Sequence, residues 1–222
     1  MSSPDHAGVV FFDVDGTLVP GTSSSLHLAG FLGHRDELAR AEDAYAAGEL
    51  DNRQVSELDA AGWAGVSEER VSGWLDGLPL VAGIAEIAWC RRNGLAPVLA
   101  TLAWSPVGGH LAGRFGFHAF GGPRLETAGG RFTGRVARHF DEYDKRDVAL
   151  TQARELGLAP ARCGAVGDSR SDLPLFASVG LSVAFNASAG ARAAATVTVD
   201  DADLRSVLPA LARMVSATGR RP

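Results

Sequence analysis

Residues 9–17 of the chain read VVFFDVDGT, and this stretch decides the fold. Its four leading apolar residues, two of them β-branched, predict a fully buried strand. The strand runs into two carboxylates, Asp13 and Asp15, and then into Gly16 and Thr17. Because open α/β sheets bind ligands at the carboxyl ends of their strands, the motif predicts a site there. Carboxylates crowded at such a point repel each other unless a cation lies between them, so the motif also predicts a metal.

Taken alone, the acidic motif has simpler interpretations. An acidic turn or a helix cap would also place Asp13 and Asp15 next to a glycine. A calcium loop does not fit, because Gly16 is the fourth residue of the motif instead of the sixth and the flanking residues are strand-like. Further motifs in the chain are needed to distinguish an acidic turn or helix cap from a ligand-binding site.

Composition limits the possible class of protein. The chain has 222 residues, a formal net charge of −5 and 46% hydrophobic residues, which suits one large domain or a core domain with a small second one. This charge provides no electrostatic basis for binding nucleic acid or an anionic membrane surface. The longest apolar run, residues 95–104, is interrupted by Pro97 and Thr101 and is too short to span a bilayer.

The cysteines and the N-terminus indicate the compartment. Cys90 and Cys163 lie far apart and match no metal-ligand spacing, so we expect buried free thiols. Residues 1–8 lack the basic region and apolar stretch of a signal peptide. We therefore expect a cytoplasmic protein. From its net charge we expect no nucleic-acid or membrane partner, and we expect a monomer or a homodimer without a sequence feature that decides between them.

The segment 20–80 contains no convincing strand and predicts a small all-helical module. Ser67 is expected to be an N-cap, since Glu68 and Glu69 follow it. Glycines separate the expected helices. These helices cover residues 24–32, 36–47, 52–61 and 68–75.

From residue 81 onward, strands alternate with helices. Strands are expected at residues 95–101, 163–167, 181–185 and 196–199, and helices at 84–93, 105–115, 144–156, 173–178 and 204–215, with a hairpin turn at 128–130. This alternation predicts an α/β fold with a doubly wound, mainly parallel, Rossmann-like sheet. We expect residues 1–19 and 81–222 to form one α/β domain and residues 20–80 to form a helical domain inserted after its first strand.

Two polar residues lie at promising places in this core. Thr101 ends the strand at 95–101 and could donate its hydroxyl to a ligand oxygen, although a threonine at a strand end is common. Lys145 lies in the first turn of a helix, where its charge opposes the helix dipole. It is the one lysine of the chain, beside twenty arginines, so a bound anion would explain it, while a solvated surface lysine is the simpler alternative.

Residues 166–175, VGDSRSDLPL, hold a further acidic pair. Asp168 follows a predicted strand and could face the same cation as Asp13 and Asp15. Asp172 could hold Lys145 or a metal-bound water. An N-cap with an acidic first turn is the simpler interpretation of both aspartates.

Taken together and in this order, the motifs around Asp13, Thr101, Lys145 and Asp168 resemble those of the haloacid dehalogenase superfamily of phosphoaspartate-forming hydrolases. The resemblance is to its phosphoserine phosphatase-like branch, in which a helical cap is inserted directly after the first motif. It implies that residues 20–80 are this cap domain and that residues 1–19 and 81–222 are the catalytic core domain. It covers residues 9–211 and is specific in the core motifs but not in the cap.

The resemblance implies a Mg²⁺-dependent phosphatase acting on a small phosphorylated metabolite. Asp13 would be the nucleophile that forms an aspartyl phosphate. Asp15 would protonate the leaving alkoxide and later activate water, which requires a raised pKa. Mg²⁺ would be held by Asp13, by the backbone carbonyl of Asp15 and by Asp168.

The resemblance also implies roles around the phosphate. Thr101 and Lys145 would bind the phosphoryl oxygens, and Thr17 would help to fix the loop. Leu102 and Trp104 belong to the substrate-binding segment, where the family has small residues. Trp104 could stack on a substrate, or it could be a core or cap-facing tryptophan.

The cap departs from the phosphoserine pattern. Family members carry a Glu nine residues after the nucleophile and an Arg in the cap, where this chain has Thr22 and, by an ungapped comparison, Asp59. Asp59 would repel the carboxylate of phosphoserine, so an amine- or hydroxyl-bearing alcohol phosphate suits this cap better. His27 and Arg53 are further polar cap residues to test.

Other functions fit the motifs less well. A phosphotransferase or mutase could pass the same aspartyl phosphate to a sugar hydroxyl and shares the core. A signalling receiver domain carries its phosphorylated aspartate after the third strand, too late to match Asp13. A catalytically inactive binding module is at odds with the filled catalytic positions, and a haloacid dehalogenase would not need Asp15.

Overall fold

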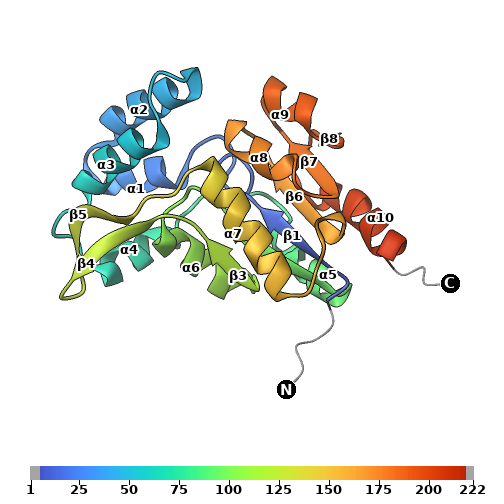
Figure 1. Ribbon diagram of the computed structural model, residues 1–222. Coiled ribbons are helices and arrows are strands. Elements are labelled where there is room, and N and C mark those ends of the chain that lie inside the picture. The colour runs from blue at the N-terminus through green and yellow to red at the C-terminus, as the bar shows by residue number, and fades with distance from the viewer. Residues whose placement is uncertain (1–5, 219–222) are drawn as a thin grey trace.

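The computed structural model describes residues 6–218 and shows an α/β core with a cap beside it (Figure 1). The core contains a six-stranded parallel sheet with the order β3-β2-β1-β6-β7-β8. This sheet confirms the predicted doubly wound α/β fold. Its strands are β1 (Gly8–Phe12), β2 (Leu95–Ala100), β3 (Ala119–Gly121), β6 (Cys163–Gly167), β7 (Leu181–Phe185) and β8 (Val197–Val199).

The central strand β1 contacts hydrophobic cores on both faces of the sheet. Val10 and Phe12 pack with α5 (Ile87–Arg92), α6 (Ser105–Phe115) and α10 (Leu208–Thr218) on one face. Val9 and Phe11 pack on the other face with α7 (Glu142–Glu155), α8 (Leu173–Phe176) and α9 (Ala189–Ala194). Successive side chains of a strand point to opposite faces, so burial on both sides explains the uninterrupted apolar run.

Several expected helices differ in detail. The helices expected at 84–93 and 204–215 each begin as a short 3₁₀ segment, η1 (Ile84–Glu86) and η4 (Leu204–Val207). Two further 3₁₀ segments, η2 (Pro160–Arg162) and η3 (Arg170–Asp172), flank β6. The strand β3 is not predicted from the sequence, because its three residues are too few to show a periodic pattern.

The cap contains the helices α1 (Ser24–Leu32), α2 (Arg35–Ala47), α3 (Asn52–Gly62) and α4 (Glu68–Leu75). Ser67 is the N-cap of α4, as predicted, and its side chain accepts a hydrogen bond from the Arg70 amide. Asp51 caps α3 in a capping box with Gln54. The segment 20–80 is thus helical as its sequence predicted.

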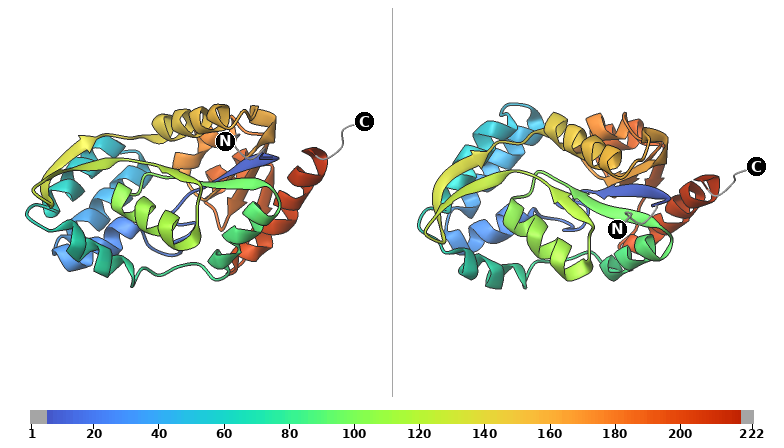
Figure 2. Two further views of the ribbon diagram at one scale, coloured as in Figure 1. Left: turned by 90° about the horizontal axis from the view of Figure 1, so that it is seen from below. Right: turned by 60° about the horizontal axis from the view of Figure 1, so that its bottom comes forward.

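A hairpin of β4 (Arg124–Ala128) and β5 (Arg131–Arg138) forms a separate antiparallel sheet. It confirms the turn predicted at 128–130, but it leaves the core and runs alongside the cap helices (Figure 2). The Phe132 carbonyl accepts a hydrogen bond from the Gly65 amide at 2.8 Å, and the Phe132 amide donates to the Val66 carbonyl at 2.9 Å. A part of the 81–222 segment, assigned by sequence to the core, therefore packs on the cap.

Cys90 and Cys163 are both buried free thiols, as expected. Within residues 6–218 we find no helix that combines the length and the apolar character of a membrane span.

Candidate active site

Three predicted site residues meet at one edge of the sheet. β1 lies between β2 and β6, and all three strands are parallel, so their carboxyl ends lie together. Asp13, Thr101 and Asp168 follow directly on these strands. The Asp13 amide donates to the Val166 carbonyl of β6 at 2.9 Å. This edge is the topological switch point of the sheet, where α/β proteins place their ligands.

Lys145 connects two of the aspartates. Its Nζ lies 3.0 Å from Asp13 Oδ1 and 2.7 Å from Asp172 Oδ1. All three side chains are buried. Burial alone would lower the pKa of Lys145, but Asp13 and Asp172 raise it, so the ammonium stays charged. The alternative of a solvated surface lysine is therefore wrong.

The start of α7 places Lys145. Asp141 is the N-cap of α7, and the Asp141 side chain accepts hydrogen bonds from the amides of Tyr143 at 2.8 Å and Asp144 at 2.9 Å. An N-cap of this kind fixes where a helix begins and how it is rotated. The two carboxylates next to Lys145 compensate for a cation near the positive end of a helix dipole.

Asp172 organises the loop after β6. Its Oδ2 accepts hydrogen bonds from the amides of Asp168 at 3.0 Å and Ser169 at 3.1 Å, while Oδ1 faces Lys145. Asp172 is thus both part of a capping box with Ser169 and a partner of Lys145. The contact with Lys145 that the sequence suggested is therefore present, whereas the side chain of Asp172 does not act as an N-cap: Ser169 is the N-cap of η3, and Asp172 forms no side-chain capping bond at the start of α8.

The first motif packs closely against Asp168. Thr17 Oγ1 donates to Asp168 Oδ1 at 3.0 Å. Gly16 has a φ of 82°, and a Cβ atom at this position would lie 2.2 Å from Asp168 Oδ2. Only glycine fits both the backbone conformation and the space.

The buried carboxylates have raised pKa values. Burial raises the pKa of Asp13 to about 7, although the charge of Lys145 opposes the shift. Burial, reinforced by Asp13 and Asp172, raises the pKa of Asp168 to about 8. Ionising Asp13 and Asp168 at the same time therefore costs free energy unless a further cation lies close to them.

The residues present fit a divalent metal ion. Asp13, Asp168 and Asp172 each place a carboxylate oxygen within 4.8 Å of the others. An all-oxygen, carboxylate-rich set is what Mg²⁺ prefers. The Asp172 oxygens already face Lys145 and two amides, which leaves Asp13 and Asp168 as the side chains suited to a metal.

The Asp15 side chain turns away from this cluster. Its Oδ1 accepts a hydrogen bond of 2.6 Å from the Ser24 amide at the beginning of α1. Burial raises its pKa, against the opposing effect of the Ser24 hydrogen bond. A carboxyl group with a raised pKa is suited to donate a proton.

A cavity of about 430 Å³ lies between the cap and this edge of the core. Its walls include many residues singled out from sequence, namely Asp13, Asp15, Thr22, Asp59, Thr101, Leu102, Trp104 and Asp168. Thr17 and Lys145 are fully buried and do not line the cavity. Thr101 Oγ1 accepts a hydrogen bond from the Ala103 amide at 3.0 Å, which fixes the start of this loop.

Two suggested cap residues lie outside the cavity. His27 contacts the Trp74 carbonyl at 3.1 Å through Nε2 and packs against Phe31. Arg53 forms an exposed ion pair with Glu57. Neither of these two polar cap residues is therefore among the residues that line the cavity.

Asp59 is the centre of a buried hydrogen-bond network. Its Oδ1 contacts His34 Nε2 at 2.7 Å and accepts from Trp63 Nε1 at 3.2 Å. Its Oδ2 accepts from Trp104 Nε1 at 2.7 Å. Trp104 therefore faces the cap, one of the two alternatives given above, and joins the loop after β2 to α3.

Glu42, Tyr45 and Arg170 line the cavity but were not singled out from sequence. Glu42 and Tyr45 follow the buried Leu38 at four and seven residues, so all three share one face of α2. A carboxylate on the apolar face of a helix was the pattern that could have revealed Glu42.

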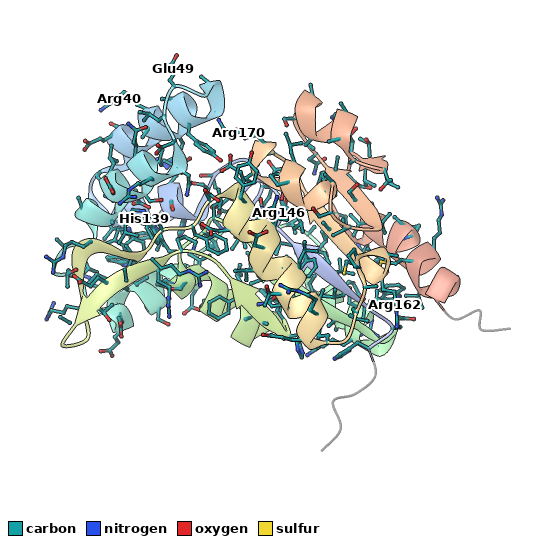
Figure 3. The ribbon with its side chains drawn as sticks, in the orientation of Figure 1. Arg40, Glu49, His139, Arg146, Arg162 and Arg170 are labelled. Atoms are coloured by element: carbon teal, nitrogen blue, oxygen red, sulfur yellow. The ribbon has the colours of Figure 1, made fainter. Side chains whose placement is uncertain are left out.

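Arg170 joins the core to the cap. Its guanidinium lies 4.3 Å from the centre of the Tyr45 ring and donates to the Tyr45 carbonyl at 2.7 Å. It also lies 3.5 Å from Glu142. Figure 3 shows Arg170 at the boundary between α2 and the core.

Comparison with known proteins agrees with this geometry. The model of the haloacid dehalogenase-like hydrolase family matches residues 10–177. Phosphoserine phosphatase of Albidiferax ferrireducens is 29% identical over 208 residues, which cover 90% of this chain and 87% of that protein. Phosphoserine phosphatase of Halobacterium salinarum is 29% identical over 198 residues, which cover 88% of this chain and 93% of that protein.

Solved structures share the fold. A phospho-aspartyl intermediate analogue of phosphoserine phosphatase superposes with a TM-score of 0.82 at 22% identity, covering 91% of this chain and 98% of that chain. A substrate-bound phosphoserine phosphatase superposes with a TM-score of 0.83 at 21% identity, covering 91% of this chain and 97% of that chain. The chain therefore belongs to the haloacid dehalogenase-like hydrolases and is an enzyme of the phosphatase kind, similar to the phosphoserine phosphatases.

Proposed function

We propose that this protein is a Mg²⁺-dependent phosphomonoester hydrolase that acts on a small phosphorylated metabolite through an aspartyl phosphate. The observation that carries the proposal is the buried pairing of Asp13 with Lys145, 3.0 Å apart, beneath a partly open cavity that Asp13 lines. A site of this kind acts by positioning the phosphoryl group and neutralising its charge. We further propose that it works in the cytoplasm as a monomer or a homodimer.

In the first step, a carboxylate oxygen of Asp13 attacks phosphorus and the ester P–O bond breaks. The leaving oxygen takes a proton from Asp15, whose pKa is raised by burial. In the second step, Asp15 takes a proton from water, the water oxygen attacks phosphorus, and Asp13 is restored as inorganic phosphate leaves.

The neighbouring residues hold the phosphoryl group in place. Lys145 would offset the charge of Asp13 and of the phosphoryl oxygens, and Thr101 would bind another of those oxygens. Asp172 keeps Lys145 in position, and Thr17 holds Asp168. Asp13, Asp168 and the backbone carbonyl of Asp15 would hold Mg²⁺, which supplies further neutralisation of negative charge when bound.

The cavity favours a leaving group other than serine. Thr22 and Asp59 line it at the positions where the resemblance calls for a glutamate and an arginine. The Asp59 oxygens are engaged by His34, Trp63 and Trp104, so a substrate carboxylate would meet a carboxylate there instead of a guanidinium. Transfer of the phosphoryl group to a second alcohol is the alternative use of the same aspartyl phosphate.

The proposal is tested by phosphate release from a panel of small phosphomonoesters, with Mg²⁺ or with EDTA. We expect Asp13→Asn to lower turnover by at least about 10³-fold, because it removes the nucleophile. Asp147→Asn, on the exposed side of α7, is the matched control and should retain activity. Turnover that persists in EDTA and in Asp13→Asn would refute the assignment, and a new phosphate ester instead of free phosphate would indicate transfer.

A further inference from the structure

Glu42 is an acidic residue of the cavity wall to which the mechanism assigns no role. Its Oε1 accepts a hydrogen bond of 2.7 Å from Ser23 Oγ, the N-cap of α1. Among residues 6–218, no basic side chain forms an ion pair with Glu42. A partly buried carboxylate without a cationic partner is unusual, because its desolvation is not compensated.

The position of Glu42 relates it to the leaving group. Ser23 binds Glu42, and the next residue, Ser24, donates its amide to Asp15 at 2.6 Å. Adjacent residues at one helix end therefore hold both Glu42 and the proposed proton donor to the leaving oxygen. A group attached close to that oxygen would come within reach of Glu42.

The charges around the cavity favour a cation there. Five carboxylates line it, those of Asp13, Asp15, Glu42, Asp59 and Asp168. Within the described part of the chain, Arg170 provides the one guanidinium of the lining, and Glu142 and the Tyr45 carbonyl already engage it. Both Asp59 oxygens are likewise engaged, so among the cap carboxylates of the lining Glu42, with Ser23 on Oε1 alone, is the one suited to meet a ligand.

The pKa of Glu42 agrees with this role. Burial, together with the nearby charges of Asp15 and Asp59, raises it to about 7, against the effect of the Ser23 hydrogen bond. An ammonium group beside Glu42 would favour its ionised form and form a charge-assisted hydrogen bond.

We infer that Glu42 binds a protonated amine on the leaving group, so that the substrates are phosphate monoesters of amino alcohols that carry no carboxylate. This inference rests on the proposed phosphatase function. Glu42 is then a specificity residue, separate from the residues that act on phosphorus.

The test compares three esters of similar size, 2-aminoethyl phosphate, propyl phosphate and carboxymethyl phosphate, with p-nitrophenyl phosphate as a general ester. The variants are Glu42→Gln, which keeps the shape and removes the charge, and Glu42→Asp, which keeps the charge. Glu49→Gln is the matched control, because Glu49 lies just after α2, outside the cavity and on the outer surface (Figure 3).

We expect wild type and Glu49→Gln to prefer 2-aminoethyl over propyl phosphate by about 10–100-fold in kcat/KM, as one charge-assisted contact allows. In Glu42→Gln the preference should fall to within about twofold, through a higher KM for the amine alone. Glu42→Asp, which keeps the charge, should retain part of the preference for 2-aminoethyl phosphate over propyl phosphate.

Three results overturn the inference while leaving the phosphatase intact. These are equal use of the amine and propyl esters by wild type, a preference for the carboxymethyl ester, and an equal loss on all esters in Glu42→Gln. Absence of phosphate release from every ester, p-nitrophenyl phosphate included, overturns the proposed function itself and the inference with it.

Discussion

At the scale of single residues, Lys145 shows how one charge organises the site. Its ammonium lies between Asp13 and Asp172, and all three side chains are buried, Asp13 alone being slightly exposed where it lines the cavity. Lysine carries a compact charge on a flexible chain, so it can be buried between two carboxylates where a planar guanidinium would need more space.

Removing this charge tests that account. We expect Lys145→Met to lower the free energy of unfolding by about 3–5 kcal/mol, because it leaves two carboxylates buried without a cation. Urea unfolding at pH 7 measures the loss, and phosphate release should fall by at least about 10²-fold. Arg146→Met, at the next and more exposed position, is the control. Equal stabilities for the two variants would contradict the role assigned to Lys145.

Glu42 predicts a pH dependence of stability. Folding raises its pKa from an ordinary value of 4.5 to about 7. Between these values the folded state binds the proton more tightly than the unfolded state, so ionisation of Glu42 reduces stability as the pH rises through this window.

Glu42→Gln removes this titration. We expect the stability of the variant relative to wild type to increase by roughly 1–3 kcal/mol between pH 5 and pH 8. Thermal or urea unfolding at both pH values provides the measurement, with Glu49→Gln as the control that should show no such change. Parallel stability curves for Glu42→Gln and wild type would show that the carboxylate is not desolvated.

At the scale of elements, the hairpin β4–β5 completes the cap. Phe132 on β5 is 4% exposed and packs edge-on against Trp63 of the cap at 5.0 Å between ring centres. Trp63 in turn donates to Asp59 at the cavity wall. The hairpin therefore packs against the residues behind Asp59 and stabilises this wall of the cavity.

Truncating this contact should destabilise the cap. We expect Phe132→Ala to cost about 3–5 kcal/mol, through lost apolar burial and the space left beside Trp63. Phe120→Ala on β3, where the side chain is 40% exposed, should cost less. Urea unfolding followed by tryptophan fluorescence compares the two, and a smaller loss for Phe132→Ala than for Phe120→Ala would refute the packing role.

The elements also differ in how readily sequence revealed them. The bounds of β6, β7, α1, α4 and α6 were predicted to the residue, because buried apolar runs, caps and C-terminal glycines are local features. The strand β3 was missed, since three residues carry no periodicity. The sequence predicted the hairpin turn, but not the surface on which the hairpin packs.

At the scale of the whole molecule, several contacts join the cap to the core, and two of them involve residues that line the cavity on both sides. Arg170 of the core binds Tyr45 on α2. On α3, Asp59 accepts the buried hydrogen bond from Trp104 of the core. We expect these contacts to hold the cap closed over a substrate, which excludes water from the site.

The Trp104 contact provides the test. We expect Trp104→Phe to reduce stability by about 1–3 kcal/mol, because an oxygen of the buried Asp59 loses its donor. Hydrogen exchange at the α3 amides should quicken and KM should rise as the cap opens more often. Trp89→Phe, in α5 of the core, is the control. Unchanged exchange in α3 would show that the hydrogen bond does not hold the cap.

The sequence by itself determined the parallel sheet, the inserted helical segment and the residues around Asp13. Continuous apolar runs mark strands buried on both faces, and carboxylates directly after them lie at one edge of the sheet because parallel strands end together. Only the tertiary structure decided that Lys145 is buried, that the hairpin packs on the cap, and that Glu42 faces the cavity. A charged residue on a helix has the same local pattern whether it faces solvent or a cavity. Which of these it faces depends on how distant elements pack.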